Sequence, residues 1–179
     1  MTSAPAERGS ADETRDTQRR GESRRAVGAA RSEQVGRHRR FRVLVADDDA
    51  RSLDCLVALL DREGFSIDLA NCGFEALARF GLSNAGVSVE VPAPREEVVT
   101  PYDFIVLDYN MPDVTGIEVL RRIRVRFGGA LPAIMVSGDY SRELQKSWSA
   151  VGGFALLPKP VEPDDFRNQV RQLVQRFFG

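Results

Sequence analysis

Five polar residues of this sequence have types and positions that could bind a metal ion and a phosphoryl group together. Asp47, Asp48 and Asp108 follow two short apolar runs. Ser137 ends a third run, and Lys159 comes shortly after a fourth. Clustered carboxylates repel one another unless a cation lies between them, and their hard oxygen atoms suit Mg²⁺. The Ser137 hydroxyl and the Lys159 ammonium could hold phosphoryl oxygens, which would make Asp108 the nucleophile.

Each of these residues also has a simpler explanation. An Asp often caps a helix, and a lysine at the end of a strand is often only solvated. Any one of them alone is therefore weak evidence. Polar residues of these types that end or follow four different predicted strands of one sheet are hard to obtain by chance. We therefore expect them to share one site at an edge of the sheet.

From residue 41 onward, short β-rich apolar runs alternate with stretches of helical spacing. Several runs are almost continuously apolar, which is typical of parallel strands buried on both faces. In such α/β folds, ligands bind beyond the carboxyl ends of the strands. The pattern predicts a doubly wound α/β domain with five parallel strands: Phe41 to Ala46, Ser66 to Ala70, Tyr102 to Leu107, Ala133 to Ser137 and Phe154 to Leu157.

Between and after these strands, apolar residues recur at the spacing of one helix face. Trp148 lies on such a stripe and is expected in the core. Pro163 suits the first turn of the last helix. The predicted stripes are Leu53, Leu56, Val57 and Leu60; Ile117, Leu120, Ile123 and Phe127; Leu144, Trp148 and Val151; and Phe166, Val170, Leu173, Val174 and Phe177.

Composition excludes several classes of protein. The 42% hydrophobic and 28% charged fractions of the 179 residues are typical of a globular chain and not of a collagen-like or wholly disordered one. No apolar run approaches the roughly 20 residues of a membrane-spanning helix. Cys55 and Cys72 form no disulfide framework, and no apolar secretion signal stands at the start, so we expect a cytoplasmic protein. Both thiols are expected to be small buried hydrophobic groups.

Charge is divided unevenly along the chain. Residues 1–40 carry 10 Arg and 6 acidic residues, whereas the remainder carries 15 basic and 20 acidic side chains. Because residues 1–40 also lack Leu, Ile, Phe, Tyr and Trp, we expect a disordered, Arg-rich N-terminal arm. The absence of aromatic residues from this arm disfavours nucleic-acid binding. Residues 83–101 are too many for an ordinary loop between a helix and a strand, and we interpret them as an insertion.

Four segments of the sequence resemble those of response-regulator receiver domains of two-component signalling: VLVADDD, IVLDYNMPDVTG, IMVSGD and LLPKP. The resemblance covers residues 41–178 and implies a flavodoxin-like receiver fold with strand order 2-1-3-4-5. It also implies a cis peptide bond between Lys159 and Pro160. Leu156 departs from the family, which often has an aromatic residue there that moves with the switch hydroxyl. Pro158 is also unusual, and is acceptable if the fifth strand lies at the edge of the sheet.

The resemblance assigns roles to the acidic residues and to one neighbour. It implies that Asp108 accepts a phosphoryl group. It further implies that Asp48, Asp108 and the backbone carbonyl of Asn110 bind Mg²⁺ directly. Asp47 would then act on the ion mostly through water.

Ser137 and Lys159 match the family's switch hydroxyl and its lysine. The implied function is that of a receiver, which takes a phosphoryl group from a phosphohistidine of a sensor histidine kinase or a histidine phosphotransfer protein. The phosphorylated form would signal to an unknown output protein through a conformational shift and protein contact. Because the sequence ends with the fifth predicted helix, we expect a single-domain regulator or phosphorelay intermediate. It would not be an enzyme beyond its own phosphorylation and dephosphorylation.

Two other functions are open at this point. A phosphatase resembling the haloacid-dehalogenase group also uses an Asp after a strand, Mg²⁺, a hydroxyl and a lysine. Such enzymes need a second Asp two residues after the nucleophile, where this chain has Asn110, and this argues against that activity. The other alternative is a scaffold that is not phosphorylated, or a nucleic-acid-binding module that uses the Arg-rich arm. No membrane partner is expected.

Overall fold

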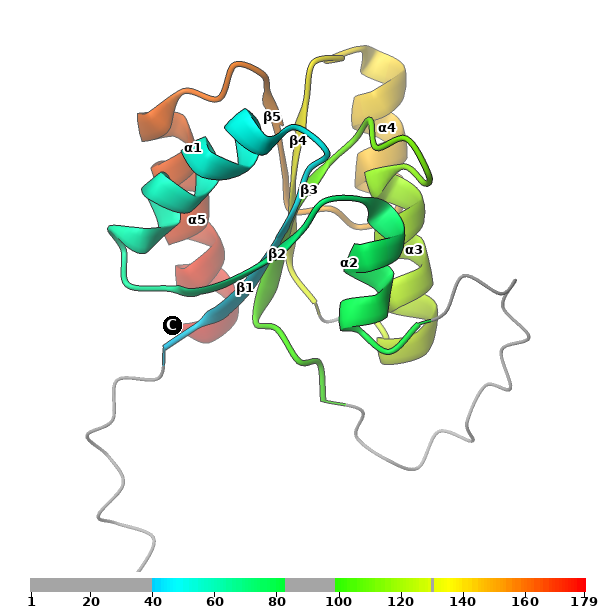
Figure 1. Cartoon of the computed structure of the whole chain (residues 1–179), viewed down its shortest axis with the longest axis horizontal. Helices are drawn as coiled ribbons and strands as arrows, with labels where there is room; N and C mark the ends of the chain where they lie inside the picture. Colours follow the sequence, from blue (N-terminus) through cyan, green and yellow to red (C-terminus); the bar gives the residue numbers. More distant parts are fainter. Residues whose placement is uncertain (1–39, 83–98, 130) are drawn as a thin grey trace, which may run out of the picture. The chain divides into compact units, whose positions relative to one another are not determined.

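The computed structural model describes residues 40–82, 99–129 and 131–179 and contains a five-stranded sheet (Figure 1). Neighbouring strands pair in parallel in the order β2-β1-β3-β4-β5, which confirms the predicted α/β fold. Nearly all of the predicted arm over 1–40, and most of the predicted insertion over 83–101, lie outside the described residues. The strands are β1 (Arg42–Ala46), β2 (Ser66–Ala70), β3 (Phe104–Asp108), β4 (Ala133–Ser137) and β5 (Ala155–Pro158).

Helices cover both faces of the sheet, as in a doubly wound fold (Figure 1). Helices α1 and α5 pack on one face, and α2, α3 and α4 pack on the other. Pro163 begins the last helix, as predicted. Within the described part of the chain, no helix is both long and apolar enough to cross a bilayer. The helices are α1 (Ala50–Asp61), α2 (Gly73–Arg79), α3 (Gly116–Phe127), α4 (Arg142–Ala150) and α5 (Pro163–Phe178).

The sheet separates two hydrophobic clusters because successive side chains of a strand point to opposite faces. In β1, Val43 and Val45 pack with α1 and α5, whereas Leu44 and Ala46 pack with the helices on the other face. Every residue of β3 and β4 is buried. Trp148 is buried in the cluster between the sheet and the helices α2, α3 and α4, which confirms its predicted place in the core. The central strands therefore hold the residues at their carboxyl ends in fixed positions.

Two strand ends differ from the prediction, and both lie at the candidate site. The predicted third strand ends at Leu107, but β3 includes Asp108. The predicted fifth strand ends at Leu157, but β5 continues to Pro158. The apolar pattern marks buried side chains, whereas backbone pairing continues one residue further. Proline has no N–H, so the backbone N–H of the following Lys159 donates to the carbonyl of β4 instead, and β5 is an edge strand as expected.

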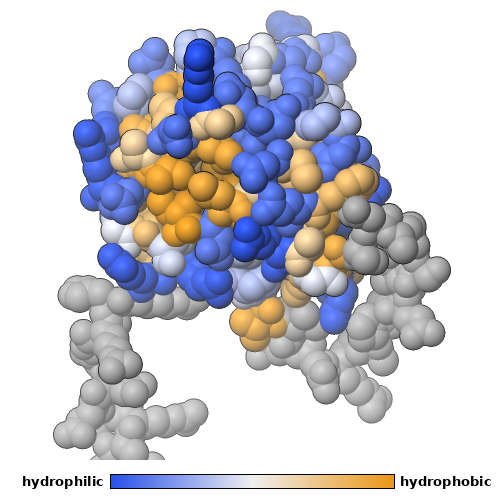
Figure 2. Space-filling model, in the orientation of Figure 1, coloured by the Kyte–Doolittle hydropathy of each residue, from blue (hydrophilic) through white to orange (hydrophobic). Residues whose placement is uncertain are grey.

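Strand β2 forms the other edge of the sheet, and a side chain from α2 covers part of its outer backbone. Arg79 Nη2 donates a hydrogen bond to the carbonyl oxygen of Leu69 at 3.0 Å. Leu69, in this strand, is 37% exposed. Figure 2 shows an apolar area over β2 and beside α1. Ile67, on the same strand, is half-buried against the cluster beneath α1. An exposed apolar area therefore adjoins an edge strand that has one of its outer carbonyls, that of Leu69, paired with Arg79.

The prediction that both cysteines are small buried hydrophobic groups is wrong. Cys55 is exposed on α1. It lies about 200° around the helix from Leu53 and only about 40° from Leu59, and so stands at the border of the buried stripe. Cys72 is only partly buried and caps α2, where its Sγ accepts a hydrogen bond from the backbone N–H of Glu75 at 3.4 Å.

Candidate functional site

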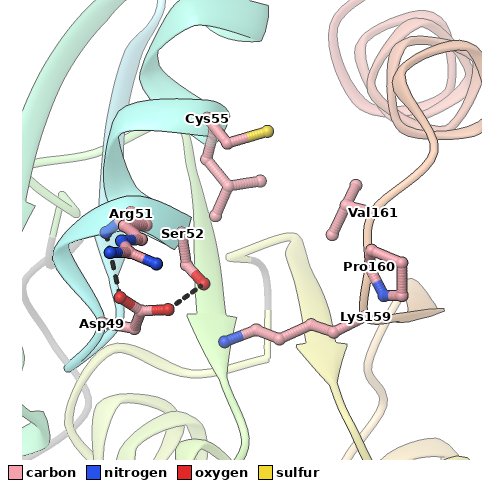
Figure 3. Close-up of a pocket in the computed structure, with 8 residues that line it drawn as sticks. Asp49, Arg51, Ser52, Cys55, Lys159, Pro160 and Val161 are labelled. Carbon is pink, nitrogen blue, oxygen red and sulfur yellow. Dashed lines mark hydrogen bonds between the residues drawn. The ribbon is translucent and has the colours of Figure 1, made fainter.

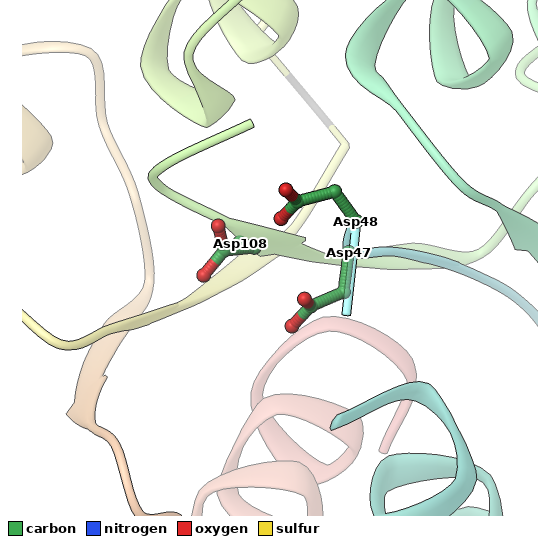
Figure 4. A group of neighbouring side chains, drawn as sticks. All are labelled: Asp47, Asp48 and Asp108. Atoms are coloured by element: carbon green, nitrogen blue, oxygen red, sulfur yellow. The ribbon is translucent and has the colours of Figure 1, made fainter. Parts of the chain in front are cut away.

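Three carboxylates meet at the carboxyl ends of two neighbouring strands (Figure 4). Asp47 and Asp48 follow β1, and Asp108 ends β3, so the parallel pairing of these strands brings them to the same edge. Their ligand oxygen atoms all lie within 4.8 Å of one another. Asp47 and Asp108 are buried, at 0% and 3% exposure, whereas Asp48 is exposed. The structure thus brings these three predicted residues together with one of them open to solvent.

Lys159 extends from the segment after β5 to the two buried carboxylates. Its Nζ lies 2.6 Å from Asp47 Oδ2 and 2.7 Å from Asp108 Oδ1. Burial lowers the pKa of Lys159, but the two carboxylates outweigh burial and hold the pKa above its ordinary value. Burial raises the pKa of Asp47, and this effect exceeds the lowering by its hydrogen bonds. The peptide bond between Lys159 and Pro160 is cis, as the resemblance implies.

Ser137, the last residue of β4, is fully buried between the strands that carry the acidic cluster and the lysine. Its carbonyl oxygen accepts a hydrogen bond from the backbone N–H of Lys159 at 2.8 Å. Its Oγ accepts a hydrogen bond from the backbone N–H of Asp139 at 3.0 Å. The hydroxyl therefore has a partner in the loop after β4 and still has its own proton to donate.

The loop between β3 and α3 begins at the edge that carries the carboxylates. Asn110, the predicted carbonyl ligand, lies in this loop two residues after Asp108 and is exposed. Gly116 begins α3 and packs so closely that a Cβ there would overlap the carbonyl oxygen of Asp108. The close approach of α3 to the end of β3 therefore requires glycine at this position.

Asp113 fastens the same loop to α2, and the sequence interpretation missed it. Its carboxylate accepts hydrogen bonds from the backbone N–H groups of Gly73 at 2.9 Å, Phe74 at 2.6 Å and Val114 at 2.9 Å. Burial raises the pKa of Asp113, but these N–H groups together outweigh burial and hold the pKa below its ordinary value. Gly73 lies 40 residues away in the sequence, so no local pattern indicates this contact.

A groove of about 230 Å³ lies beside the lysine, between the start of α1 and the segment that leads from β5 to α5 (Figure 3). Asp49 caps α1 by accepting hydrogen bonds from the Arg51 backbone N–H at 3.0 Å and from Ser52 Oγ at 3.3 Å. Lys159 points across the groove toward this capped turn (Figure 3). The lining residues are Asp49, Arg51, Ser52, Cys55, Leu56, Lys159, Pro160 and Val161.

These groups have the chemistry required for phosphoryl transfer to a carboxylate. Asp108 can supply a nucleophilic oxygen, Lys159 can neutralise negative charge, and the Ser137 hydroxyl can donate a hydrogen bond. A set of carboxylate oxygens with one exposed member, Asp48, also fits a hard divalent cation such as Mg²⁺.

A parallel sheet of order 2-1-3-4-5, with an acidic cluster, a hydroxyl and a lysine at its carboxyl edge, defines a receiver domain of a signalling protein. The family model described as the response regulator receiver domain matches residues 43–171. The chain belongs to this family, and the resemblance found in the sequence is confirmed. Receiver domains are generally signalling proteins and not true enzymes, and they generally bind Mg²⁺ at such an acidic cluster. Those of response regulators are phosphorylated by sensor histidine kinases.

Similar proteins include several transcriptional regulators. The transcriptional regulatory protein ResD of Bacillus subtilis (strain 168) is 32% identical over 135 residues, which cover 75% of this chain and 48% of ResD. The transcriptional regulatory protein TctD of Salmonella typhimurium (strain SL1344) is 30% identical over 139 residues, which cover 78% of this chain and 54% of TctD. The chain thus spans about half the length of the curated relatives it matches.

Solved structures show the same fold. The receiver domain of the Francisella response regulator 1452 is 28% identical, with a TM-score of 0.60, and the match covers 76% of this chain and 98% of that chain. A CheY-like receiver domain protein from Methanospirillum hungatei JF-1 is 25% identical, with a TM-score of 0.61, and the match covers 76% of this chain and 95% of that chain. These comparisons do not favour the alternatives of a phosphatase, a scaffold or a nucleic-acid-binding module.

Proposed function

We propose that this protein accepts a phosphoryl group on Asp108 from a phosphohistidine of a sensor histidine kinase or a histidine phosphotransfer protein. A carboxylate oxygen of Asp108 forms a bond to phosphorus while the bond between phosphorus and the imidazole nitrogen breaks. The leaving nitrogen takes up a proton from solvent, so the products are a neutral histidine and an aspartyl phosphate. The aspartyl phosphate is the signal.

The surroundings of Asp108 are the observation that carries this proposal. The side chain is buried at the end of a central strand, yet its carboxylate contacts Lys159 Nζ at 2.7 Å. Asp47, also buried, shares the same ammonium group at 2.6 Å. A buried carboxylate with a cation beside it and a hydroxyl on the next strand is arranged to receive and hold a phosphoryl dianion.

Mg²⁺ fits the carboxylates at this edge. We assign Asp48, Asp108 and the backbone carbonyl of Asn110 as its direct ligands, with Asp47 acting mostly through water. The two oxygens of Asp47 already accept hydrogen bonds from a backbone N–H at 3.0 Å and from Lys159 Nζ at 2.6 Å, so the exposed Asp48 is more available. When bound, the ion would neutralise negative charge on the incoming phosphoryl group.

Ser137 and Lys159 orient the product and transmit its presence. The phosphoryl oxygens accept hydrogen bonds from the Ser137 hydroxyl and the Lys159 ammonium, and the new negative charge draws both groups inward. Because Ser137 ends β4 and Lys159 follows β5, this movement changes the surface formed by β4, β5 and their loops. The output protein reads that change by direct contact.

The groove beside Lys159 gives the partner its approach to Asp108. It is lined by the capped first turn of α1 and by the segment after β5, so a partner surface that lies along α1 brings its phosphohistidine to the carboxylate edge. Arg51 and Cys55, both exposed on α1, lie where such a partner would make contact. Substitutions at these two positions should therefore change transfer from the partner more than labelling by a small phosphodonor.

Labelling with acetyl phosphate tests the assignment of Asp108. With Mg²⁺ present, intact-mass measurement should show one added phosphoryl group on the wild-type protein and none on Asp108→Asn. Asp54→Asn, a matched change at an exposed acid of α1, should be labelled like the wild type. Persistent labelling of Asp108→Asn, or labelling with the metal chelated, would contradict the proposal. If Asp108 is labelled as expected, phosphotransfer profiling against the histidine kinases of the source organism would identify the partner.

A further inference from the structure

A continuous series of hydrogen bonds leads from the Ser137 hydroxyl to the start of α4. Ser137 Oγ accepts from the Asp139 backbone N–H at 3.0 Å. The Asp139 carboxylate accepts from the Ser141 backbone N–H at 2.9 Å through Oδ1 and from Ser141 Oγ at 3.1 Å through Oδ2. Ser141 in turn caps α4, where its Oγ accepts from the backbone N–H of Leu144 at 3.3 Å. We call the two contacts between Asp139 and Ser141 the Asp139–Ser141 bridge.

The opposite end of α4 is fastened to the core by different contacts. The Arg124 guanidinium donates to the carbonyl oxygens of Val151 and of Gly152, the latter at 2.8 Å. Trp148 is 3% exposed, and its Nε1 donates to the Ala155 carbonyl at 2.9 Å. These contacts do not depend on Ser137. The last turn of α4 is therefore held by hydrogen bonds to α3 and β5, whereas the hydrogen bonds of its first turn run to the loop after β4 and its core contact is the buried side chain of Leu144.

From this asymmetry we propose that Asp139 is the positioning residue that couples Ser137 to α4. The inference rests on the proposed phosphorylation of Asp108. When the Ser137 hydroxyl turns inward to donate to the phosphoryl group, its hydrogen bond draws the Asp139 backbone with it. Both oxygens of Asp139 hold Ser141, so the first turn of α4 follows while the last turn stays in place.

The side chain of Leu156, on the neighbouring strand β5, offers no hydrogen-bonded alternative to the connection through Asp139. Leu156 of β5 lies opposite Met135 of β4 and packs against the core cluster beneath α4. An aliphatic side chain neither donates to nor accepts from a hydroxyl, so it cannot follow Ser137 through a hydrogen bond. Two hydrogen-bonded connections join the loop after β4 to the first turn of α4 among the described residues: the Asp139–Ser141 bridge, and a hydrogen bond from Gln145 Nε2 to the Tyr140 carbonyl at 3.1 Å. Only the bridge uses the side chain of Asp139, whose backbone N–H contacts the Ser137 hydroxyl.

The bridge needs hydrogen bonds at Asp139 and does not need its negative charge. Asparagine retains an oxygen that can accept from the Ser141 N–H, and its amide nitrogen can donate to Ser141 Oγ. Alanine removes both contacts. The pair Asp139→Ala and Asp139→Asn therefore separates loss of the bridge from loss of charge. Glu143→Gln, at an exposed acid in the first turn of α4, is the matched control for charge alone.

Hydrogen exchange followed by mass spectrometry, with and without acetyl phosphate and Mg²⁺, measures the coupling. In the wild type, phosphorylation should change amide exchange over residues 142–146 by about fivefold or more, with a much smaller change over residues 149–153. Asp139→Ala should be phosphorylated on Asp108 and lose the response of residues 142–146. Asp139→Asn and Glu143→Gln should retain it. Exchange without the phosphodonor, measured for every variant, separates fraying of α4 from loss of the response.

Three results would overturn the inference. One is a phosphorylated Asp139→Ala protein whose α4 responds like that of the wild type. Another is an Asp139→Asn protein that is folded and phosphorylated but has lost the response, since asparagine keeps the bridge. A third is loss of the response in Glu143→Gln. Absence of labelling on wild-type Asp108 would instead overturn the proposed function, and the inference with it.

Discussion

Replacing Asp113 tests whether a single carboxylate holds the loop after β3 to α2. In the folded protein its Oδ1 accepts from the N–H groups of Gly73 and Val114, and its Oδ2 accepts from that of Phe74. Gly73 is buried at the start of α2, so water does not readily replace the lost acceptor there. Asp113→Ala should therefore loosen the contact between α2 and the loop that carries Asn110.

The size of the effect follows from the number of hydrogen bonds lost. At a net value of about 1 kcal/mol for each intramolecular hydrogen bond, Asp113→Ala should lower the free energy of unfolding by about 3 kcal/mol. For a domain of this size, that is a fall in melting temperature of roughly 10 °C. Asparagine can keep its oxygen toward Gly73 and Val114 but places an amide donor against the Phe74 N–H. We therefore expect Asp113→Asn to lose about 2 kcal/mol.

The pH dependence has a definite sign because the pKa of Asp113 is lowered in the folded protein. A carboxyl with a lowered folded pKa stabilises the fold at pH values above its unfolded pKa of about 3.9. That stabilisation disappears as the pH falls through the folded pKa. Because asparagine does not titrate, the difference between the wild type and Asp113→Asn should be constant near neutral pH and decrease below about pH 4.

Urea unfolding followed by circular dichroism, repeated between neutral pH and about pH 3, measures these differences. Asp54→Asn removes the same charge from an exposed position on α1 and should change stability by less than about 0.5 kcal/mol. The reasoning fails if Asp113→Ala costs no more than this control. It also fails if the difference between the wild type and Asp113→Asn does not decrease at low pH.

Three further predictions test other parts of the site and the core. Lys159→Met should lower the free energy of unfolding by about 3 kcal/mol, because two buried carboxylates lose their cation. Mg²⁺ should then increase the stability of this variant more than that of the wild type. Lys146→Met, at an exposed lysine of α4, is the control, and an equal loss of stability in the two variants would refute the prediction. In calorimetric titrations, Asp48→Ala should weaken Mg²⁺ binding more than Asp47→Ala, and equal weakening would contradict the ligand ranking. Gly153→Ala would push a Cβ into the ring of Trp148 in α4. The variant should therefore have a free energy of unfolding lower by about 1–3 kcal/mol and a shifted tryptophan fluorescence. Unchanged stability would show that the indole moves freely.

Much of the fold is predictable because its central strands are apolar on both faces. The run Ala133 to Ser137 coincides with β4, since a continuous apolar run ends where the chain reaches the polar edge of the sheet. The run Ser66 to Ala70 also coincides with its strand, β2, although β2 is an edge strand and contains Asp68. The same logic places Asp47, Asp108 and Lys159 near one another, because parallel strands end at a common edge. The apolar pattern of the strands and their parallel order therefore predict that these residues, which are far apart in the chain, lie close together.

The contacts that hold the loops are not predictable in this way. Asp113 and Asp139 are short acidic residues in loops, and from the sequence alone each could equally be solvated. Their partners are fixed by how the chain turns after β3 and β4, which depends on close packing such as that of Gly116 against the end of β3. The exposure of Cys55 was missed for a related reason, since a small side chain beside an apolar stripe can face either way.

The hydrogen bond from Arg79 to the outer carbonyl of β2 bears on how the protein behaves at high concentration. An edge strand with free backbone groups can template a strand from another copy, and an exposed apolar side chain such as Leu69 promotes that encounter. Arg79 occupies the carbonyl that an incoming strand would need, and its ion pair with Glu75 at 3.1 Å holds the guanidinium in place. Extension of the sheet between molecules must first displace a charged side chain, so this edge resists aggregation although its apolar surface is uncovered.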